Sequence, residues 1–188
     1  QGIEMTTDTQ HHSAKFDKVT RVAGLSIAVA VVVMGIKYAA YLVSGSVALY
    51  SDAAESIVNV MTAMAALLAV HIGAKPPDKD HPFGHHKAEF FAAIFEGAMI
   101  VVAAIMIMSK AYAALKQGIV LESPGLGLLI NAVATIINAS WAMLLINRGK
   151  SWRSPALAAD GWHLATDVAT SVGVIVGLAL AILTGWHF

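Results

Sequence analysis

Five long apolar stretches constrain this chain more than any other feature of its sequence. They cover residues 19–43, 47–72, 88–115, 125–146 and 155–183. A helix needs roughly 20 mainly apolar residues to cross the bilayer core, and each stretch is long enough. Charged residues make up only 13% of the chain, against about 25% in soluble domains. The sequence therefore predicts an all-α polytopic membrane protein, a helical bundle of five transmembrane helices surrounded by membrane lipid.

Short connectors with turn formers or charges separate the stretches. They lie at residues 44–46, 75–87, 117–124 and 147–154, and the second of them contains three prolines. The polar residues 1–18 read as an N-terminal tail, and the four residues before Met5 resemble the remnant of a tag. We expect residues 1–18 to form this tail and residues 19–188 to form a transmembrane domain, with no C-terminal cytoplasmic domain in this chain.

Basic residues gather on one side of the expected membrane. They lie around the start of the first stretch and in the second and fourth connectors, and a five-helix topology places these three segments on the same side of the membrane. The basic residues are Lys15, Lys18, Arg21, Lys75, Lys79, Lys87, Arg148, Lys150 and Arg153. Such an excess marks cytoplasmic segments, so we expect a cytoplasmic N-terminus and a place in a bacterial inner membrane. The net charge of zero argues against a nucleic-acid partner.

Two of the apolar stretches carry polar side chains spaced three and then four residues apart, which puts them on one helix face. These side chains are Asp52, Glu55 and Asn59 in the second stretch and Asp160, His163 and Asp167 in the fifth. A charged group inside a membrane costs about 2.5 kcal/mol or more on insertion scales and is usually functional. The alternative is a hydrogen-bond network that only holds the helices together.

The two segments that carry these side chains resemble each other. Residues 48–60 and 156–168 align with Asp52 opposite Asp160, and with the polar positions after them in the same register. The second stretch runs toward the cytoplasm in the predicted topology and the fifth runs away from it. This is the pattern of an inverted repeat, and sites at such repeat interfaces lie near the middle of the membrane.

Four of these side chains can form a binding site for a divalent cation. Two donors from each helix can close a tetrahedron around Zn²⁺ or a similar ion: Glu55, Asn59, His163 and Asp167. The chain has no cysteine, so thiolates are excluded as ligands. When the ion leaves, protons are expected to take its place, because ligands must be deprotonated to bind a metal. Asp52 and Asp160, one turn away, are expected either to orient these ligands or to cap helices.

Several other polar residues are read more simply. Lys37 lies inside the first stretch, and we expect it to snorkel or to form a packed ion pair rather than to act in transport. Glu96 is expected to join an interhelical network, and Asn131 and Asn138 to donate hydrogen bonds between helices. The loop after the second stretch holds Asp78, Asp80, His81, His85 and His86. Composition alone leaves a metal site and a solvated loop equally open there.

Three motifs, "GSVALYSDAAES", "PDKDHPFGHHKAE" and "HLATD", resemble those of the cation diffusion facilitator family of divalent metal transporters. The resemblance implies a transport site at Glu55, Asn59, His163 and Asp167. It also implies a second metal site in the loop, formed by Asp78, His81 and His85. Lys87, which follows this loop, is implied to take part in helix or dimer contacts. Glu55 and Asn59 depart from the family pattern, which usually has Asp or His and then Asp, so the preferred metal can differ.

The resemblance also implies a function: a homodimer that exports Zn²⁺ from the cytoplasm in exchange for protons by alternating access. Cd²⁺, Fe²⁺, Mn²⁺ and Co²⁺ are alternative cargoes. The family has six transmembrane helices and usually a cytoplasmic C-terminal domain, so we expect this five-helix sequence to be a truncated form. Two other functions stay open, an intramembrane metal-dependent enzyme and a structural membrane subunit. The sequence has no His-Glu-x-x-His motif, which argues against a common class of metal-dependent enzyme.

Overall fold

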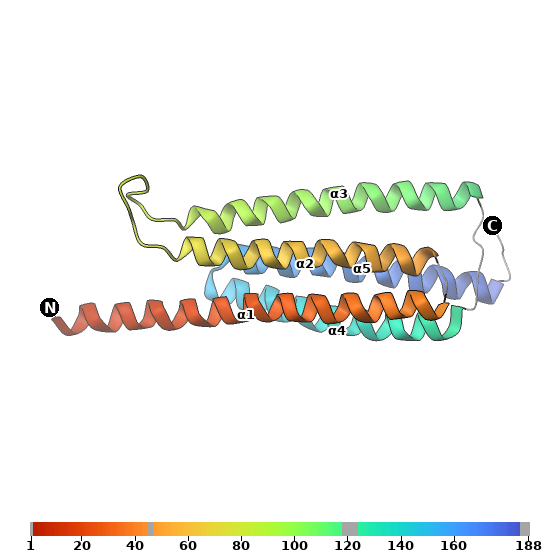
Figure 1. Ribbon diagram of the computed structural model, residues 1–188, viewed down its shortest axis with the longest axis horizontal. Helices are drawn as coiled ribbons and strands as arrows, with labels where there is room; N and C mark the ends of the chain where they lie inside the picture. The colour runs from red at the N-terminus through yellow and green to blue at the C-terminus, as the bar shows by residue number, and fades with distance from the viewer. Residues whose placement is uncertain (1, 45–46, 118–123, 185–188) are drawn as a thin grey trace.

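Five helices form the protein, in a computed structural model that describes the backbone of residues 2–44, 47–117 and 124–184. They run back and forth along one long axis (Figure 1): α1 (Gly2–Ser44), α2 (Val47–Gly73), α3 (Lys87–Gln117), α4 (Pro124–Trp152) and α5 (Pro155–Thr184). No strand occurs in these described ranges. The predicted all-α bundle of five helices is therefore confirmed.

Four helices contain described segments that are long and apolar enough to cross a membrane: Asp17–Ser44, Leu49–Gly73, Lys87–Met106 and Leu126–Trp152. Helix α5 has 30 residues, which at 1.5 Å per residue is about 45 Å and exceeds the bilayer core. The flanks of the bundle expose large apolar side chains such as Leu42, Leu68, Phe91 and Leu129. Lipid can cover these side chains, as expected of a polytopic membrane protein.

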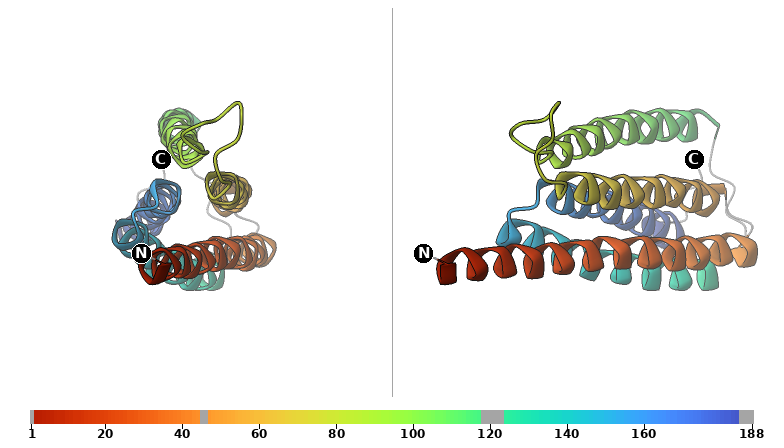
Figure 2. Two further views of the ribbon diagram at one scale, coloured as in Figure 1. Left: turned by 90° about the vertical axis from the view of Figure 1, so that its left-hand side faces the viewer. Right: turned by 60° about the vertical axis from the view of Figure 1, so that its left-hand side comes forward.

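The arrangement of the helices places α2 and α5 at the centre of the bundle. Both contact α3, while α1 packs on α2 and α4 packs on α5 and α1. The end-on view shows α3 on one side of the α2–α5 pair and α1 and α4 on the other (Figure 2). Because α2 and α5 run in opposite directions, residues that follow one another along α2 meet residues in reverse order along α5.

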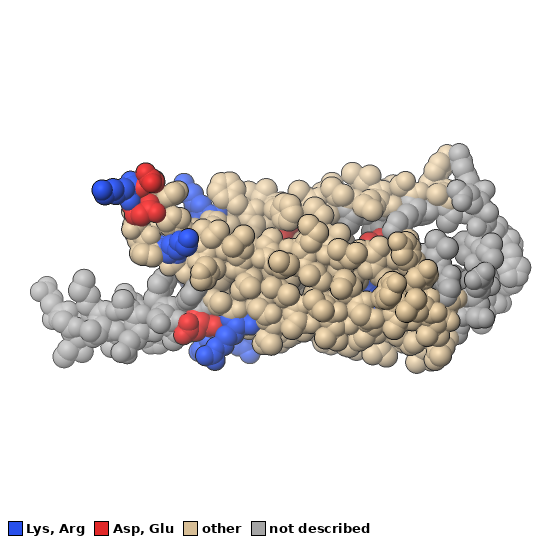
Figure 3. Space-filling view, viewed as in Figure 1, with Lys and Arg blue, Asp and Glu red and all other residues tan. Residues whose placement is uncertain are grey.

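Charged side chains gather at one end of the molecule. On the face in Figure 3 they surround the end that carries the N-terminus and the α2–α3 loop, and the flank is almost free of charge. The short link between α4 and α5 lies at this same end (Figure 1). The basic segments that sequence analysis assigned to one side of the membrane therefore do lie together.

Two helix boundaries differ from the sequence-based expectation. Residues 2–18, read as a tail, continue helix α1. Helix α4 extends to Trp152, so the expected connector at 147–154 shrinks to Arg153 and Ser154. Gly149 does not end α4, because it lies against α5: a Cβ atom there would come within 2.5 Å of the Ala158 nitrogen.

The tight turn between α4 and α5 fixes how these helices pack. Arg153 has a φ of 51°. The Ser154 hydroxyl accepts a hydrogen bond from the Leu157 N–H at 3.5 Å. Ser154 is therefore the N-cap of α5, and Pro155 occupies the first helical position. One turn further, a Cβ atom on Gly161 would lie 2.8 Å from the Ile146 nitrogen. Small residues thus let the two backbones approach closely and hold the polar face of α5 toward the bundle.

Candidate metal centre

The four predicted transport ligands line one cavity between α2 and α5. Asn59 Oδ1 lies 3.0 Å from His163 Nε2, which joins the two helices directly. Glu55 and Asp167 line the same cavity, whose volume is about 120 Å³. Asn59, His163 and Asp167 are all less than 10% exposed, and Glu55 is half-buried. The structure therefore brings together all four residues, and their role as metal ligands stays a prediction.

The remaining wall of this cavity is mostly apolar. Met99, Val102 and Met106 of α3 contribute side chains to it, together with threonines of α5. These α3 residues are partly exposed in the single chain. The cavity thus lies between polar residues of α2 and α5 and apolar side chains of α3, and a mostly apolar wall with a few polar groups is typical of ligand sites.

Asp52 lies in the acidic part of this centre rather than at a helix cap. Its carboxylate and those of Glu55 and Asp167 each offer an oxygen, and these three atoms lie within 4.8 Å of one another. Asp52 Oδ1 accepts a bond from Ser171 Oγ at 3.1 Å. Asp52 Oδ2 is buried and has no hydrogen-bond partner among the described residues. Three carboxylates this close concentrate negative charge in a small volume, and nearby cations can balance that charge.

Lys37 of α1 supplies one such cation. Its Nζ lies 2.9 Å from Asp52 Oδ1 and 2.9 Å from Asp167 Oδ2, and its side chain is fully buried. It also donates to Ser171 Oγ at 3.3 Å. The interpretation of Lys37 as a packed ion pair is confirmed, and snorkelling is wrong because the ammonium points into the bundle.

Asn138 of α4 also contacts the centre. Its Nδ2 donates to Asp167 Oδ2 at 2.7 Å, which confirms the predicted interhelical hydrogen bond. Asn131, seven residues earlier, is equally buried, but neither of its side-chain polar atoms has a partner in the described part of the chain. The prediction for Asn131 is therefore not supported. Ser171 was missed altogether, although it lies one helical turn beyond Asp167 on the same face.

Asp160 does not lie with the acidic group. Its Oδ2 accepts a hydrogen bond from Ser26 Oγ at 2.7 Å, and Trp141 Nε1 donates to the same hydroxyl at 3.1 Å. Asp160 therefore ties α5 to α1 and α4, and sequence analysis gave no signal for Ser26. Glu96 is fully buried on α3, yet no described residue hydrogen-bonds to its carboxylate. The expected network around Glu96 is thus absent from the described residues.

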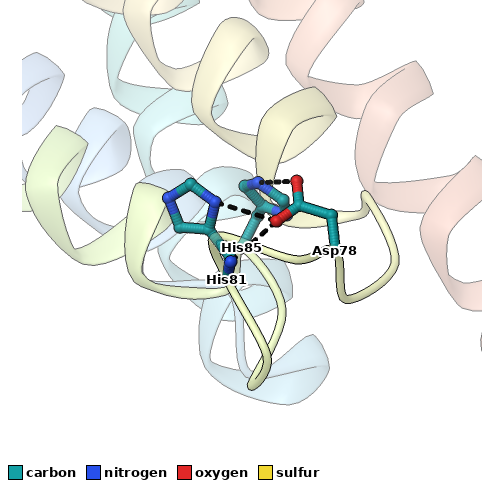
Figure 4. Close-up of side chains that lie close together, drawn as sticks. All are labelled: Asp78, His81 and His85. Carbon is teal, nitrogen blue, oxygen red and sulfur yellow. Dashed lines mark hydrogen bonds and ion pairs between the residues drawn. The ribbon is translucent and has the colours of Figure 1, made fainter.

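The loop between α2 and α3 holds a second group of possible ligands. Asp78, His81 and His85 point toward one another (Figure 4). Asp78 Oδ1 lies 3.2 Å from His81 Nδ1, and Asp78 Oδ2 lies 3.4 Å from His85 Nε2. One ligand atom from each residue falls within 4.8 Å of the others. The three residues that the family resemblance implied are the three that the loop brings together.

The loop backbone helps to position this group. The His81 N–H donates to Asp78 Oδ1 at 2.7 Å, and this bond holds the pKa of the Asp78 carboxyl below its usual value of 3.8. Gly84, at a φ of 80°, makes the turn that a side chain would strain. Lys87 begins α3 and is exposed. Its expected helix or dimer contact stays a prediction.

A known protein family matches most of the chain. The cation efflux transmembrane domain matches residues 24–188, nearly the whole chain. The chain belongs to the cation efflux family, the cation diffusion facilitators. Sequence analysis had reached the same family from its three motifs, and that recognition is confirmed.

Three relatives illustrate the range of the cation efflux family. An uncharacterized transporter of Synechocystis, sll1263, is 46% identical over 88% of this chain and 54% of its own length. The manganese efflux system protein MneP of Bacillus subtilis is 31% identical over 98% of this chain and 61% of its own. The cation-efflux pump FieF of Escherichia fergusonii is 30% identical over 90% and 56%. These names describe transport rather than catalysis.

The matched region spans little more than half the length of each of these relatives. The family match extends to the last residue of the sequence. Helices α1–α5 are therefore the part that can be compared. They hold the four residues that the family resemblance implied as transport ligands, which line one cavity.

Proposed function

We propose that this chain forms the transport core of a proton-coupled antiporter that exports divalent transition-metal cations from the cytoplasm by alternating access. The observation that carries the proposal is the contact of Asn59 on α2 with His163 on α5. It lies on the wall of a cavity that Glu55 and Asp167 also line. Two antiparallel helices thus each offer a pair of donors to one small space.

The donor set supports Zn²⁺ as the cargo and leaves related ions as alternatives. One imidazole and three oxygen donors suit Zn²⁺, while carboxylate and carbonyl oxygens also suit Mn²⁺. A relative named as a manganese efflux protein keeps Mn²⁺ among the candidates. Fe²⁺, Co²⁺ and Cd²⁺ are the others. A dication held by Glu55 and Asp167 has its charge balanced, which reduces the cost of burying it.

Protons are the counter-ion that this donor set supports. A carboxylate or imidazole must give up its proton to bind a metal, so metal and protons exclude each other at Glu55, His163 and Asp167. An antiporter needs this competition, because each ion must leave before the other enters. The loop group of Asp78, His81 and His85 would supply a second, more exposed metal site at the end of the bundle that we assign to the cytoplasm.

The assembly and orientation follow from the same proposal. The clustering of basic residues at one end favours a cytoplasmic N-terminus, in the inner membrane of a bacterium. A homodimer would cover part of the exposed apolar surface of α3, and Lys87 at the start of α3 is placed to take part in helix or dimer contacts.

Two other functions make different predictions. An intramembrane metal-dependent enzyme would turn over a substrate in detergent, where a transporter needs a sealed compartment. A structural subunit would use the buried contacts of Lys37, Asp52 and Asn138 only to hold helices in register. It would then have no saturable metal site that depends on His163 or Asp167. The relatives' names favour transport over both alternatives.

A metal-binding and transport experiment tests the proposal. We expect the purified chain to bind Zn²⁺ or Mn²⁺ saturably in calorimetry, and an element-specific measurement to locate the ion between α2 and α5. His163→Ala and Asp167→Ala should abolish uptake into inverted vesicles while helicity is retained. The matched control is His71→Ala, an exposed histidine at the end of α2. Binding at the loop group of Asp78, His81 and His85 should survive both cavity variants, so an unchanged number of saturable sites in these variants would reject the cavity site.

A further inference from the structure

Glu96 is a buried carboxyl group that the proposed transport site does not use. It lies on α3, is fully buried and does not line the cavity of the proposed ligands. Neither of its carboxyl oxygens has a hydrogen-bond partner in the part of the chain that the structure describes. An ionised carboxylate without a partner is very costly to bury, and such a group takes up a proton instead. The surroundings of Glu96 therefore favour a bound proton.

The packing of α3 on α5 places Asp160 next to Glu96. The two helices begin at the same end of the bundle and run in the same direction (Figure 1). Ala92 of α3 and Ala156 of α5 belong to one buried core cluster. Glu96 and Asp160 each follow these alanines by about one helical turn, and Asp160 is close enough for its charge to act on Glu96. Two buried carboxyl groups thus meet between α3 and α5.

We propose that Glu96 and Asp160 form a proton-binding pair of carboxyl groups, a site separate from the proposed metal donors that takes part in the exchange of metal for protons. The ligand of this site is a single proton that the two groups compete for. The binding of this proton stands on the geometry of the α3–α5 contact alone. Its part in the exchange rests on the proposed transport function.

The hydrogen bonds of the pair decide which member carries the proton. Two neighbouring carboxyl groups cannot both be ionised in a poorly solvated place, because like charges repel. Ser26 Oγ donates to Asp160 Oδ2 at 2.7 Å and itself accepts a hydrogen bond from Trp141 Nε1 at 3.1 Å. Such a donor favours the ionised form of Asp160, whereas Glu96 has no described donor. The proton therefore lies on Glu96 and the negative charge lies on Asp160.

Helix α2 brings no ionisable group to the level of Glu96. A Cβ atom on Gly73 of α2 would lie 3.5 Å from Glu89 Cγ of α3. Because these helices are antiparallel, about two turns along each of them bring the buried Ala66 to the level of Glu96. The ionisable residues of α2 lie more than one turn from this level, and they are His71, Glu55 and Asp52. Glu96 thus lies between an apolar part of α2 and Asp160 on α5.

The helices packed against Asp160 bring no ion pair to it. On α5 itself, the nearest ionisable residue is His163, one turn further along the helix. The charged residues of α1 and α4 lie more than one turn from the positions of Ser26 and Trp141, and the nearest of them are Arg21, Lys37 and Arg148. No described Lys or Arg forms an ion pair with Glu96 or Asp160. Among the described residues, no cation therefore takes the place of the proton.

His163 connects the carboxyl pair to the transport site. It follows Asp160 on α5, and its Nε2 lies 3.0 Å from Asn59 Oδ1 on the wall of the cavity. A dication held there stabilises carboxylates nearby, so its binding favours the loss of the Glu96 proton. Linkage is reciprocal, so this proton weakens metal binding by the same factor. Metal entry therefore releases a proton in addition to those that the ligands give up.

Infrared spectroscopy of the full chain in lipid tests the proton directly. Wild-type protein with isotope-labelled glutamate should show the C=O stretch of a protonated glutamate at neutral pH, and Glu96→Gln should remove this band. Asp80→Asn, which changes an exposed carboxylate of the loop, is the matched control and should leave the band in place. Identical spectra from wild-type protein and Glu96→Gln would overturn the inference.

A second variant tests the pairing and keeps the test decisive if Glu96→Gln does not fold. Asp160→Asn removes the negative neighbour of Glu96. The Glu96 band should therefore persist at neutral pH, and it should lose less intensity as the pH is raised than the wild-type band does. A carboxyl group that only fills space between α3 and α5 would titrate alike in both proteins, and that result would overturn the pair.

Calorimetry tests the part of the pair in the exchange. The binding of Zn²⁺ and of Mn²⁺ is measured in buffers of different protonation enthalpy, which counts the protons released, in a His85→Ala background that disables the loop group. Glu96→Gln should release fewer protons than this parent, by up to about one per ion. An equal count would overturn the role of the pair in the exchange. A parent that shows the Glu96 band and binds neither metal would instead overturn the proposed function.

Discussion

Asn138 Nδ2 lies 2.7 Å from Asp167 Oδ2, so helix α4, which supplies no expected ligand, holds one of the expected ligands of α5. Both side chains are buried. Hydrogen bonds to charged groups are worth about 1.5–3 kcal/mol, and partners that orient a ligand commonly change metal affinity by about 10–100-fold. Polar side chains from four helices, α1, α2, α4 and α5, therefore meet at the centre, although only α2 and α5 carry its expected donors.

The contact of Asn138 with Asp167 gives the first prediction. Asn138→Ala should weaken metal binding by about tenfold or more, because Asp167 loses a donor that holds its carboxylate in place. Calorimetry with Zn²⁺ and Mn²⁺ measures the change. Ser140→Ala on the same helix, an exposed residue that bonds only within α4, is the control. Equal affinity in Asn138→Ala would mean that Lys37 alone positions Asp167.

Asn59 is the uncharged oxygen donor of the proposed set, and we expect it to contribute to selectivity. Asn59→Asp puts a carboxylate beside His163 and should raise the affinity for divalent ions by about tenfold or more at neutral pH. The metal must then displace an additional proton, so uptake should depend more steeply on pH. A panel of Zn²⁺, Mn²⁺, Fe²⁺, Co²⁺ and Cd²⁺ in vesicles checks both effects. Unchanged behaviour with every metal would show that Asn59 is not a ligand.

The loop group should behave as a separate and weaker site. His81→Ala or His85→Ala should remove one of two saturable metal sites and slow transport less than His163→Ala does, because the loop is exposed to water. His86→Ala is the matched control, since His86 is exposed in the same loop and lies outside the group. Loss of all metal binding in His81→Ala would show that the two sites are not independent.

The pH dependence of the loop site follows from Asp78. Because its pKa lies below 3.8 in the folded protein, the stabilisation from the ionised carboxylate is present above pH 3.8 and is lost as the pH falls further. Between pH 7 and pH 4.5 the Asp78 carboxylate therefore stays ionised and can bind a metal. Asp78→Asn should lower the affinity for a metal across this range, which calorimetry at several pH values would measure.

The close packing of α4 on α5 gives a prediction about stability. Gly149→Ala places a Cβ atom 2.5 Å from the Ala158 nitrogen, so the helices must separate, at a cost of about 1–3 kcal/mol. Gly173→Ala, on α5, has no atom within 4 Å of the new Cβ and should be neutral or slightly stabilising. Thermal unfolding in detergent compares the two. A stable Gly149→Ala protein would show that the α4–α5 contact can shift without penalty.

The helices of this protein were largely predictable because a bilayer imposes length and hydropathy on each of them. Helix α2 begins at the expected Val47 and α5 at the expected Pro155. The errors came where local signals were ambiguous. Gly149 and the polar residues around it were read as a connector, yet α4 continues through them, because the glycine serves packing against α5 rather than a turn.

The candidate centre was predictable in part. Helical periodicity and the antiparallel repeat identified Glu55, Asn59, His163 and Asp167, which line one cavity. Asp52 and Asp160 looked equivalent in the aligned segments, but the structure separates them. Asp52 contacts Lys37, whereas Asp160 contacts Ser26. No pattern within one helix distinguishes the two aspartates, because their difference lies in which neighbouring helix each one meets.

The sequence by itself determined the five helices, the polar faces of α2 and α5 and the family, since all three follow from composition and from spacing along single segments. Only the tertiary structure decided that the Lys37 ammonium points into the bundle and bonds to both Asp52 and Asp167. Those contacts join residues up to 130 positions apart. They depend on where α1 lies relative to α2 and α5, and this is a property of the assembled bundle rather than of any one of its segments.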